Sequence, residues 1–298
     1  MIKILPRPSF LVWLAVGLIM TAHGEPLTIA TYNVENYNLA DRQVEGVHRK
    51  DYPKPEAEKA ALRAVIRQID VEVLALQEIG GEPFLNELQR DLKREGVDYP
   101  YRTVFQAEDV DRMIAVLSKR PFASVKNHDD LSFKYFDGVS KVKRGLLEVR
   151  FSKTDGEVTL FVVHLKSRYT DRPDDPNSAL QRAGEAMVIR ERVLATFPDP
   201  ASARFLIMGD FNDGRTSRPV RAMLERGKTT ITDWLPAADT RGHVWSHFFR
   251  RDDSYSRVDH VLVSPGLLPK VQGQAGRIQD SIEVGLASDH RPVIVVVE

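Results

Sequence analysis

Short apolar segments that end in clusters of polar residues recur along the whole chain, and they restrict its fold more than any other feature. Four of these segments read LTIATYNVEN, VEVLALQE, TLFVVHLKS and RFLIMGDFND. Runs of this length, rich in β-branched residues, predict strands, and the polar residues that follow predict functional loops. Four further strands are predicted at MIAVLS, GLLEVRF, VDHVLVS and PVIVVVE. Their continuous apolar runs indicate burial on both faces.

Helical patterns lie between these strands. Residues 56–69 and 82–95 carry apolar residues at helical spacing, and Pro83 suits the first turn of the second helix. The longest predicted helix covers 177–197 and begins at an Asn or Ser cap. Its expected apolar face is formed by Leu180, Ala183, Met187 and Leu194. Strands interleaved with helices, with loops expected near Pro53 and Pro173, predict a single α/β domain.

The chain contains no cysteine, which removes several classes of chemistry at once. Disulfide scaffolds, cysteine nucleophiles, thiolate zinc sites and iron–sulfur clusters are all excluded. Any metal must therefore be held by carboxylate, amide, imidazole or water. Lys plus Arg and Asp plus Glu each total 42. Because the net charge is close to zero, attraction to an anionic polymer has to come from a local cluster of basic residues.

The N-terminal residues have the order of a secretory signal. Lys3 and Arg7 precede an apolar run over 10–20, and small residues follow at Ala22 and Gly24. A membrane span needs about 20 apolar residues, so an uncleaved anchor is the weaker alternative. We therefore expect a signal peptide over 1–24, a domain over 25–298 that is exported to the periplasm or secreted, and no stable membrane association after cleavage.

The segment GDFND places Asp210 and Asn212 two residues apart, directly after an apolar strand. If the backbone stays extended, both side chains face the same way. The carboxylate can take a proton from water or hold a cation, and the amide can donate to an oxyanion. Asp and Asn beside Gly are also turn-forming residues, so a purely local role is the alternative.

Polar residues close the other strands as well. Glu78 ends a buried strand, where a carboxylate is costly unless it is paired or ligates a metal. A lone histidine at a strand end, such as His164, is more often structural than catalytic. The remaining strand-end residues are Asn33, Asp259, Asp289 and His290. Six polar strand ends in one chain are more than ordinary caps and turns explain.

The ordered motifs TYNVEN, LQE, HLKS, GDFND, SRVDHVLVS and SDHRPV resemble the endonuclease/exonuclease/phosphatase superfamily. Its members include pancreatic deoxyribonuclease, abasic-site endonucleases, neutral sphingomyelinases and inositol-polyphosphate phosphatases. The resemblance covers the chain from about residue 27 to its end. It implies an α/β four-layer sandwich of two mixed β-sheets flanked by helices. It also implies a phosphoesterase that depends on Mg²⁺ or Mn²⁺.

The resemblance assigns a metal side and a catalytic side. On the metal side, Glu78 matches the principal Mg²⁺ carboxylate, Asp289 the second carboxylate, and Asn33 an amide that holds metal or phosphate. The matching catalytic residues are Arg144, His164, Asp210, Asn212, Asp259 and His290. Asp210 and Asn212 would orient or activate water. His290, oriented by Asp259, would contact the scissile phosphate. His164 matches a second histidine of the nuclease-like branch, and Arg144 a position directed toward phosphate.

The identity of the phosphoester is the least constrained inference. Arginines crowd the loops near the predicted site, at 168, 172, 215, 218, 221, 250, 251 and 257, and either track a polyanion or form a solvated face. Aromatic residues around a predicted turn near Asp252 either stack on bases or pack in the core. Export and the HLKS motif favour a nuclease with DNA or RNA as substrate. The alternatives are a phosphatase, a sphingomyelinase-like enzyme and a non-catalytic nucleic-acid-binding module.

Overall fold

Two large mixed sheets form the centre of the computed structural model, which describes residues 25–298. The predicted signal peptide over 1–24 lies outside these residues. In spatial order, the first sheet holds β16 (Ala237–Ala238), β20 (Gly276–Ile278), β21 (Val293–Val297), β1 (Leu27–Tyr37), β4 (Val73–Ile79), β6 (Met113–Ser118) and β5 (Tyr101–Phe105). The second holds β15 (Asp233–Trp234), β19 (Asp259–Val263), β12 (Phe205–Asp210), β11 (Gly156–His164), β10 (Leu146–Lys153) and β7 (Ser124–His128).

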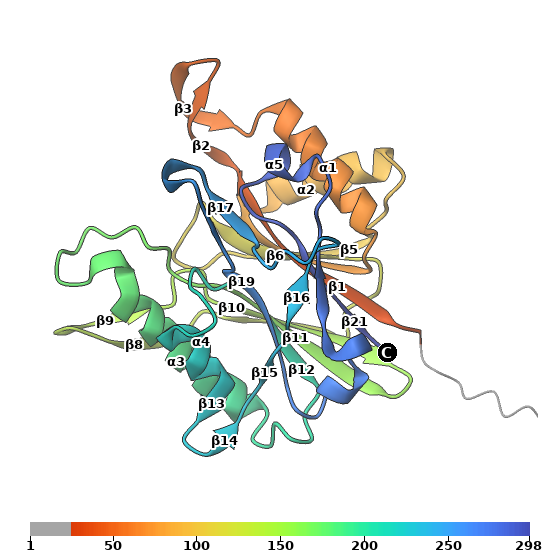
Figure 1. Cartoon of the computed structure of the whole chain (residues 1–298), viewed down its shortest axis with the longest axis vertical. Helices are drawn as coiled ribbons and strands as arrows, with labels where there is room; N and C mark the ends of the chain where they lie inside the picture. Colours follow the sequence, from red (N-terminus) through yellow and green to blue (C-terminus); the bar gives the residue numbers. More distant parts are fainter. Residues whose placement is uncertain (1–24) are drawn as a thin grey trace, which may run out of the picture.

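Helices cover the outer faces of both sheets, so the predicted four-layer sandwich is confirmed (Figure 1). The first sheet is covered by α1 (Glu56–Ile69), α2 (Glu82–Arg94) and α5 (Val284–Ala287), and the second by α3 (Ala179–Thr196) and α4 (Arg218–Leu224). One apolar core lies beneath each layer of helices, and a third lies between the sheets. In this third core Val73 and Val295 share a cluster with Val149 and Met208. This burial on both sheet faces explains the continuous apolar runs in the sequence.

Within residues 25–298, four two-stranded hairpins project from the sandwich. They are β2–β3 (Leu39–Val44 and Val47–Pro53), β8–β9 (Ser132–Tyr135 and Gly138–Lys141), β13–β14 (Glu225–Arg226 and Thr229–Thr230) and β17–β18 (His247–Phe249 and Ser254–Ser256). Single 3₁₀ turns lie at η1 (Pro176–Ser178), η2 (Arg250–Asp252), η3 (Leu268–Lys270) and η4 (Gln272–Gln274). The loop expected near Pro53 is confined to residues 54 and 55. Pro53 itself ends β3, one strand of a two-stranded ribbon whose edge tolerates a residue without an N–H. Pro173 does lie in a loop.

The longest helix does not start as predicted, and its predicted apolar face is right at Ala183 and Leu194 but wrong at Leu180. Asn177 and Ser178 adopt left-handed backbone conformations, with φ of 59° and 50°, and neither side chain caps the helix. Instead, the Asp175 carboxylate accepts the backbone N–H groups of Leu180 at 2.8 Å and Gln181 at 3.0 Å. Leu180 is 47% exposed. The buried face of α3 contains Arg182, Ala183, Glu185, Ala186, Ile189 and Val193. Two charged residues on that face reach toward the site described next.

The shorter helices agree with their predicted ranges. Helix α1 covers the predicted residues, and α2 ends one residue before its predicted end. Among residues 25–298, no helix combines the length and the apolar character needed to cross a bilayer.

Candidate active site

Three of the predicted catalytic residues lie in one row across the second sheet. His164 on β11 pairs with Asp210 on the parallel strand β12, and Asp210 pairs with Asp259 on the antiparallel strand β19. Gly209 allows the backbones of β11 and β12 to come close enough for this pairing. Its φ is +146°, and an added Cβ would lie 1.9 Å from the carbonyl oxygen of Val163. The glycine of GDFND is therefore required by the close contact between β11 and β12.

The first sheet contributes Asn33 and Glu78 from the carboxyl ends of the parallel strands β1 and β4. Glu78 lies at a break in strand register and has a φ of +67°. A left-handed conformation at a residue with a Cβ costs about 1–3 kcal/mol and is most often retained where function requires it. Oε2 of Glu78 accepts the Asn36 N–H at 2.9 Å.

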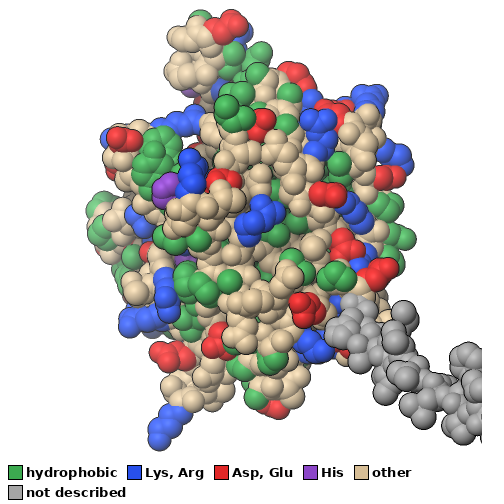
Figure 2. Space-filling model, turned by 45° about the vertical axis from the view of Figure 1, so that its right-hand side comes forward, with side chains coloured by type: hydrophobic (Ala, Val, Ile, Leu, Met, Phe, Trp, Pro, Cys, Tyr) green, Lys and Arg blue, Asp and Glu red, His purple; other side chains and the backbone are tan. Residues whose placement is uncertain are grey.

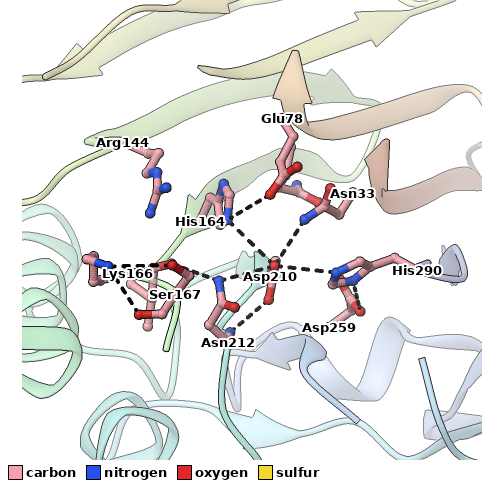
Figure 3. Close-up of polar contacts among 12 residues, drawn as sticks. Asn33, Glu78, Arg144, His164, Lys166, Ser167, Asp210, Asn212, Asp259 and His290 are labelled. Atoms are coloured by element: carbon pink, nitrogen blue, oxygen red, sulfur yellow. Dashed lines mark hydrogen bonds and ion pairs between the residues drawn. The ribbon is translucent and has the colours of Figure 1, made fainter. Parts of the chain in front are cut away.

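Asp210 lies at the centre of the site and is almost fully buried (Figure 3). Its carboxylate accepts the side-chain amide of Asn33 at 3.1 Å and the backbone N–H of Asn212 at 2.7 Å. Asn212 has a φ of +53°, so the backbone of GDFND does not stay extended and forms a turn. The turn still brings the Asn212 amide to 3.2 Å from Asp210. Burial raises the pKa of Asp210 to about 6, with the charge of His290 opposing the rise.

His290 and Asp259 form the predicted pair. Nδ1 of His290 is 2.9 Å from Oδ2 of Asp259, and the Ser246 hydroxyl donates to the same oxygen at 2.7 Å. Nε2 of His290 points toward Asp210, 3.9 Å from its Oδ2. Burial alone would lower the pKa of His290, but the charges of Asp259 and Asp210 outweigh it and raise the pKa well above its ordinary value. The imidazole is therefore positively charged at neutral pH.

His164 lies on the other side of Asp210 and behaves differently (Figure 3). Its Nε2 is 3.6 Å from Oδ2 of Asp210 and 3.8 Å from Oε1 of Glu78. Burial lowers the pKa of His164 well below its ordinary value, and the charges of Arg144 and His290 lower it further. The ring is therefore neutral, and its Nδ1 has no hydrogen-bond partner within the described chain.

Arg144 is buried beside His164 and is incompletely paired. Its Nη2 is 2.8 Å from Oδ2 of Asp109, whereas Nε and Nη1 have no partner among the residues that the structure describes. An unsatisfied buried donor costs about 1–3 kcal/mol. Two such donors on one guanidinium, at the edge of the site, fit an anionic ligand that supplies the missing acceptors.

On the metal side, both ends of the Asn33 amide form hydrogen bonds. Its Oδ1 accepts the Glu35 N–H at 3.0 Å, which leaves one lone pair on this oxygen, and its Nδ2 donates to Asp210 at 3.1 Å. Asn33 therefore acts as a donor toward Asp210. Glu78 fits a hard cation better, because no N–H or O–H group of residues 25–298 donates to its Oε1.

Asp289 is the second candidate metal ligand. Its Oδ2 is 3.6 Å from Nε2 of His247, and its backbone N–H donates to Glu35 at 3.0 Å. Burial raises its pKa, but the hydrogen bond from His247 and the charge of His290 bring it below the ordinary value. The ligand atoms of Asp289, His247 and His290 lie within 4.8 Å of one another, close enough for this group to hold a metal ion.

Two residues on α3 that position the loops of the site were not predicted from the sequence. Glu185 is fully buried and accepts the backbone N–H of Lys143 at 3.1 Å and of Lys166 at 2.7 Å. Arg182 donates to the carbonyl oxygen of Lys166 at 3.0 Å and to Asp213 at 3.0 Å. These bonds hold three loops that carry site residues. The available signal was a pair of charged residues, three apart, on the buried side of a helix.

The basic residues near the site do not form one continuous surface. Arg172 pairs with Asp174 at 2.7 Å, and Arg257 is half-buried and donates to the backbone of Asp259. Arg168 remains exposed and lies 3.9 Å from Asp213. Figure 2 shows acidic and basic side chains interspersed over the face drawn. Contacts to a polyanion would therefore depend on a few individual arginines.

Comparison with known proteins agrees with this architecture. Sphingomyelinase C from Streptomyces griseocarneus has a TM-score of 0.61 and 18% identity, covering 92% of this chain and 99% of that one. A beta toxin mutant from Staphylococcus aureus with bound magnesium ions has a TM-score of 0.63 and 16% identity, covering 91% and 99%. An endonuclease/exonuclease/phosphatase family protein from Leptotrichia buccalis has a TM-score of 0.61 and 14% identity, covering 91% and 99%.

At these identities the similarity shows the fold alone, and no curated protein matches the chain. The decisive match is to a family model. The model of the Endonuclease/Exonuclease/phosphatase family matches residues 30–290, which include every site residue described above. The resemblance seen in the six motifs is thereby confirmed, and this chain belongs to the Endonuclease/Exonuclease/phosphatase family.

Proposed function

We propose that this protein is an exported, metal-dependent phosphodiesterase that hydrolyses DNA or RNA. One observation carries the proposal: two buried cations lie on opposite sides of the Asp210–His164 pair, His290 next to Asp210 and Arg144 next to His164, and two N–H groups of Arg144 have no partner among residues 25–298. A phosphodiester anion between these groups would satisfy the donors and be stabilised as charge builds up on its oxygens. The family supports the reaction class, since its members are phosphoesterases.

Asp210 is the group best placed to orient and deprotonate the attacking water. Its pKa of about 6 leaves it ionised at neutral pH and makes it a stronger base than an ordinary carboxylate. Asn212 and Asn33 donate to this carboxylate and fix its orientation. His290 then donates from Nε2 to the phosphoryl oxygen while Asp259 holds its other ring nitrogen.

Glu78 and Asp289 are the residues that would hold Mg²⁺ or Mn²⁺. When bound there, the ion screens the negative charge on the phosphoryl and leaving oxygens. Neutral His164, between Glu78 and Asp210, adds a polar group without adding a second positive charge.

A sphingomyelinase-like activity is the second candidate, supported by the likeness to sphingomyelinase C. The two candidates share the reaction centre and differ in what surrounds the phosphate. The aromatic residues near the predicted turn bear on this difference. Phe249 is 43% exposed and Tyr255 is 57% exposed, so for these two residues the alternative of packing in the core is wrong.

The test is a substrate panel with the purified protein. Supercoiled DNA, single-stranded RNA, sphingomyelin vesicles and bis(p-nitrophenyl) phosphate are each incubated with Mg²⁺ and with excess EDTA. We expect cleavage of nucleic acid and of the chromogenic diester in Mg²⁺ only. Cleavage of sphingomyelin alone would select the second candidate, and nucleic-acid retention without cleavage would indicate a binding module. Full activity in EDTA would exclude the proposed chemistry.

A further inference from the structure

A pocket outside the catalytic row lies between the β17–β18 hairpin and α5 and has a volume of about 260 Å³. We call it the hairpin pocket. The residues used below are Trp245, Phe248, Arg250, Tyr255, Val284 and Asp289. Asp289 belongs both to this pocket and to the metal side of the active site. A group bound in the pocket would therefore lie beside the scissile phosphate.

The pocket is attached firmly to the catalytic segment. The backbone N–H of Phe248 donates to the carbonyl oxygen of Asp289 at 2.9 Å, and His247 forms a β-bridge with His290. The rings of His247 and His290 are 4.5 Å apart between centroids. Because the hairpin is hydrogen-bonded to the residues of the reaction centre, its aromatic side chains have a fixed position relative to the substrate phosphate.

Aromatic rings form one wall of the pocket. Tyr255 stacks on Phe248 with centroids 4.6 Å apart and an interplanar angle of 24°, and it contacts Trp245 at 4.8 Å. Tyr255 is nevertheless 57% exposed. An exposed ring in an ordered aromatic stack provides a surface on which a flat ligand can be buried.

Cationic groups surround this wall. One N–H of Arg250 donates to the carbonyl oxygen of Gly285 at 3.1 Å, and Arg250 forms no ion pair within residues 25–298. The Arg291 guanidinium lies 4.2 Å from the Trp245 ring centroid, and Arg241 also lines the pocket. The carboxylates of Asp280 and Asp289 also line the pocket, and Arg291 is paired with Asp239, so Arg250 is the guanidinium that remains available to an anionic group. An aromatic ring with a neighbouring phosphate fits both the wall and the charges.

We propose that the hairpin pocket binds the nucleobase of the nucleotide next to the scissile phosphate, with that nucleotide's own phosphate on Arg250. The inference rests on the proposed nuclease function and names the part of the substrate that the hairpin reads. The volume agrees with one nucleobase, since pockets for larger ligands begin at about 300 Å³. Stacking is tolerant of base identity, so we expect weak sequence preference.

The test measures binding rather than cleavage. Thymidine monophosphate, deoxyribose 5-phosphate and phosphocholine are titrated calorimetrically into the purified protein in EDTA. We expect the nucleotide to bind at least about 5-fold more tightly than the sugar phosphate, as one stacked base implies. Tyr255→Ala should abolish that difference, and Arg250→Gln should weaken both phosphates.

Two matched controls accompany these variants. Tyr101→Ala removes an exposed tyrosine at the opposite end of the first sheet, and Arg251→Gln changes the arginine next to Arg250 that does not line the pocket. Both should bind the nucleotide as the unmodified protein does. Circular dichroism checks that all four variants are folded.

Equal binding of nucleotide and sugar phosphate would overturn the proposal, as would unchanged base discrimination in Tyr255→Ala or tighter binding of phosphocholine. Failure of the proposed function has a different signature. If no nucleic acid is cleaved while the base-dependent affinity is lost in Tyr255→Ala, the pocket is supported as a nucleotide site and the nuclease activity is not.

Discussion

His290 and His164 lie on opposite sides of Asp210, and both are buried, yet their electrostatic states are opposite. His290 has Asp259 at 2.9 Å on its far nitrogen, and its pKa is raised. His164 has no partner on Nδ1 within the described residues, and it faces Arg144, so its pKa is lowered. Burial alone would make both rings neutral; one carboxylate behind the ring determines which becomes a cation.

The difference divides the site into two regions. The His290 region, held by β19 and the segment before β21, is organised to stabilise negative charge. The His164 region, held by β11 and α3, keeps a neutral ring next to a buried arginine. Asp210 lies between the two regions, so only one of its two neighbouring histidines carries a positive charge. This keeps its pKa near 6 and preserves its use as a base.

The largest effect is expected at the shared centre and the charged ring. Asp210→Ala and His290→Ala should each lower kcat by a factor of about 10² or more, the usual cost of losing an acid–base or charge-stabilising group. Single-turnover hydrolysis of bis(p-nitrophenyl) phosphate measures the effect, with circular dichroism as the folding control. A fully active double mutant would refute the assignment.

Asp259→Asn should make the charge state of His290 more like that of the neutral His164. Without the Asp259 charge, the pKa of His290 falls, so the imidazolium is lost at lower pH than in the unmodified protein. If that cation stabilises the transition state, the alkaline limit of kcat moves to lower pH, and at pH values above both pKa values kcat falls about tenfold for each unit by which the pKa has fallen. A pH–rate profile of both proteins checks this, and superimposable alkaline limbs would contradict it.

Glu185→Gln should destabilise the His164 region without changing any residue of the reaction centre. A glutamine amide presents an NH₂ group to one of the two backbone N–H donors that Glu185 now accepts. One buried donor is left unpaired, and we expect the free energy of unfolding to fall by about 1–3 kcal/mol. Urea denaturation measures this. Glu191→Gln, on the same helix but partly exposed, is the control and should change stability far less.

His164→Gln should have the smallest effect. A neutral hydrogen-bonding group is worth about 0.5–1.5 kcal/mol, so kcat should fall by about 2- to 12-fold. Because His164 is already neutral, the pH–rate profile should keep its alkaline limit. A hundredfold loss together with a shifted profile would show that His164 is charged in the working enzyme and that the two rings are equivalent.

The strand-end motifs predicted much of the site because strand register brings those ends together. His164, Asp210 and Asp259 come from three separate motifs, yet they form one row of one sheet. The hydrogen bonds of Asn33 could not be predicted in the same way, because the one from Glu35 depends on a left-handed backbone at residues 35 and 36, which no periodicity encodes.

Other parts depend on contacts between distant segments. Glu185 and Arg182 look like ordinary helical charges until α3 packs against the second sheet. The start of α3 differs from the prediction because Asp175, rather than Asn177 or Ser178, accepts the first free N–H groups of the helix. The positive φ at Asn177 forms the turn that brings Asp175 to this position. The aromatic pocket arises where the β17–β18 hairpin meets α5, two segments separated by β19 and β20 in the chain.

The central claim is that Glu78 holds a divalent cation required for phosphodiester hydrolysis. The most direct measurement is a Mg²⁺ titration of activity for the unmodified protein and for Glu78→Gln, after treatment with EDTA. Loss of a ligand should raise the half-saturating Mg²⁺ concentration by about tenfold or more. Identical titration curves for the two proteins, or full activity before Mg²⁺ is added, would contradict the claim.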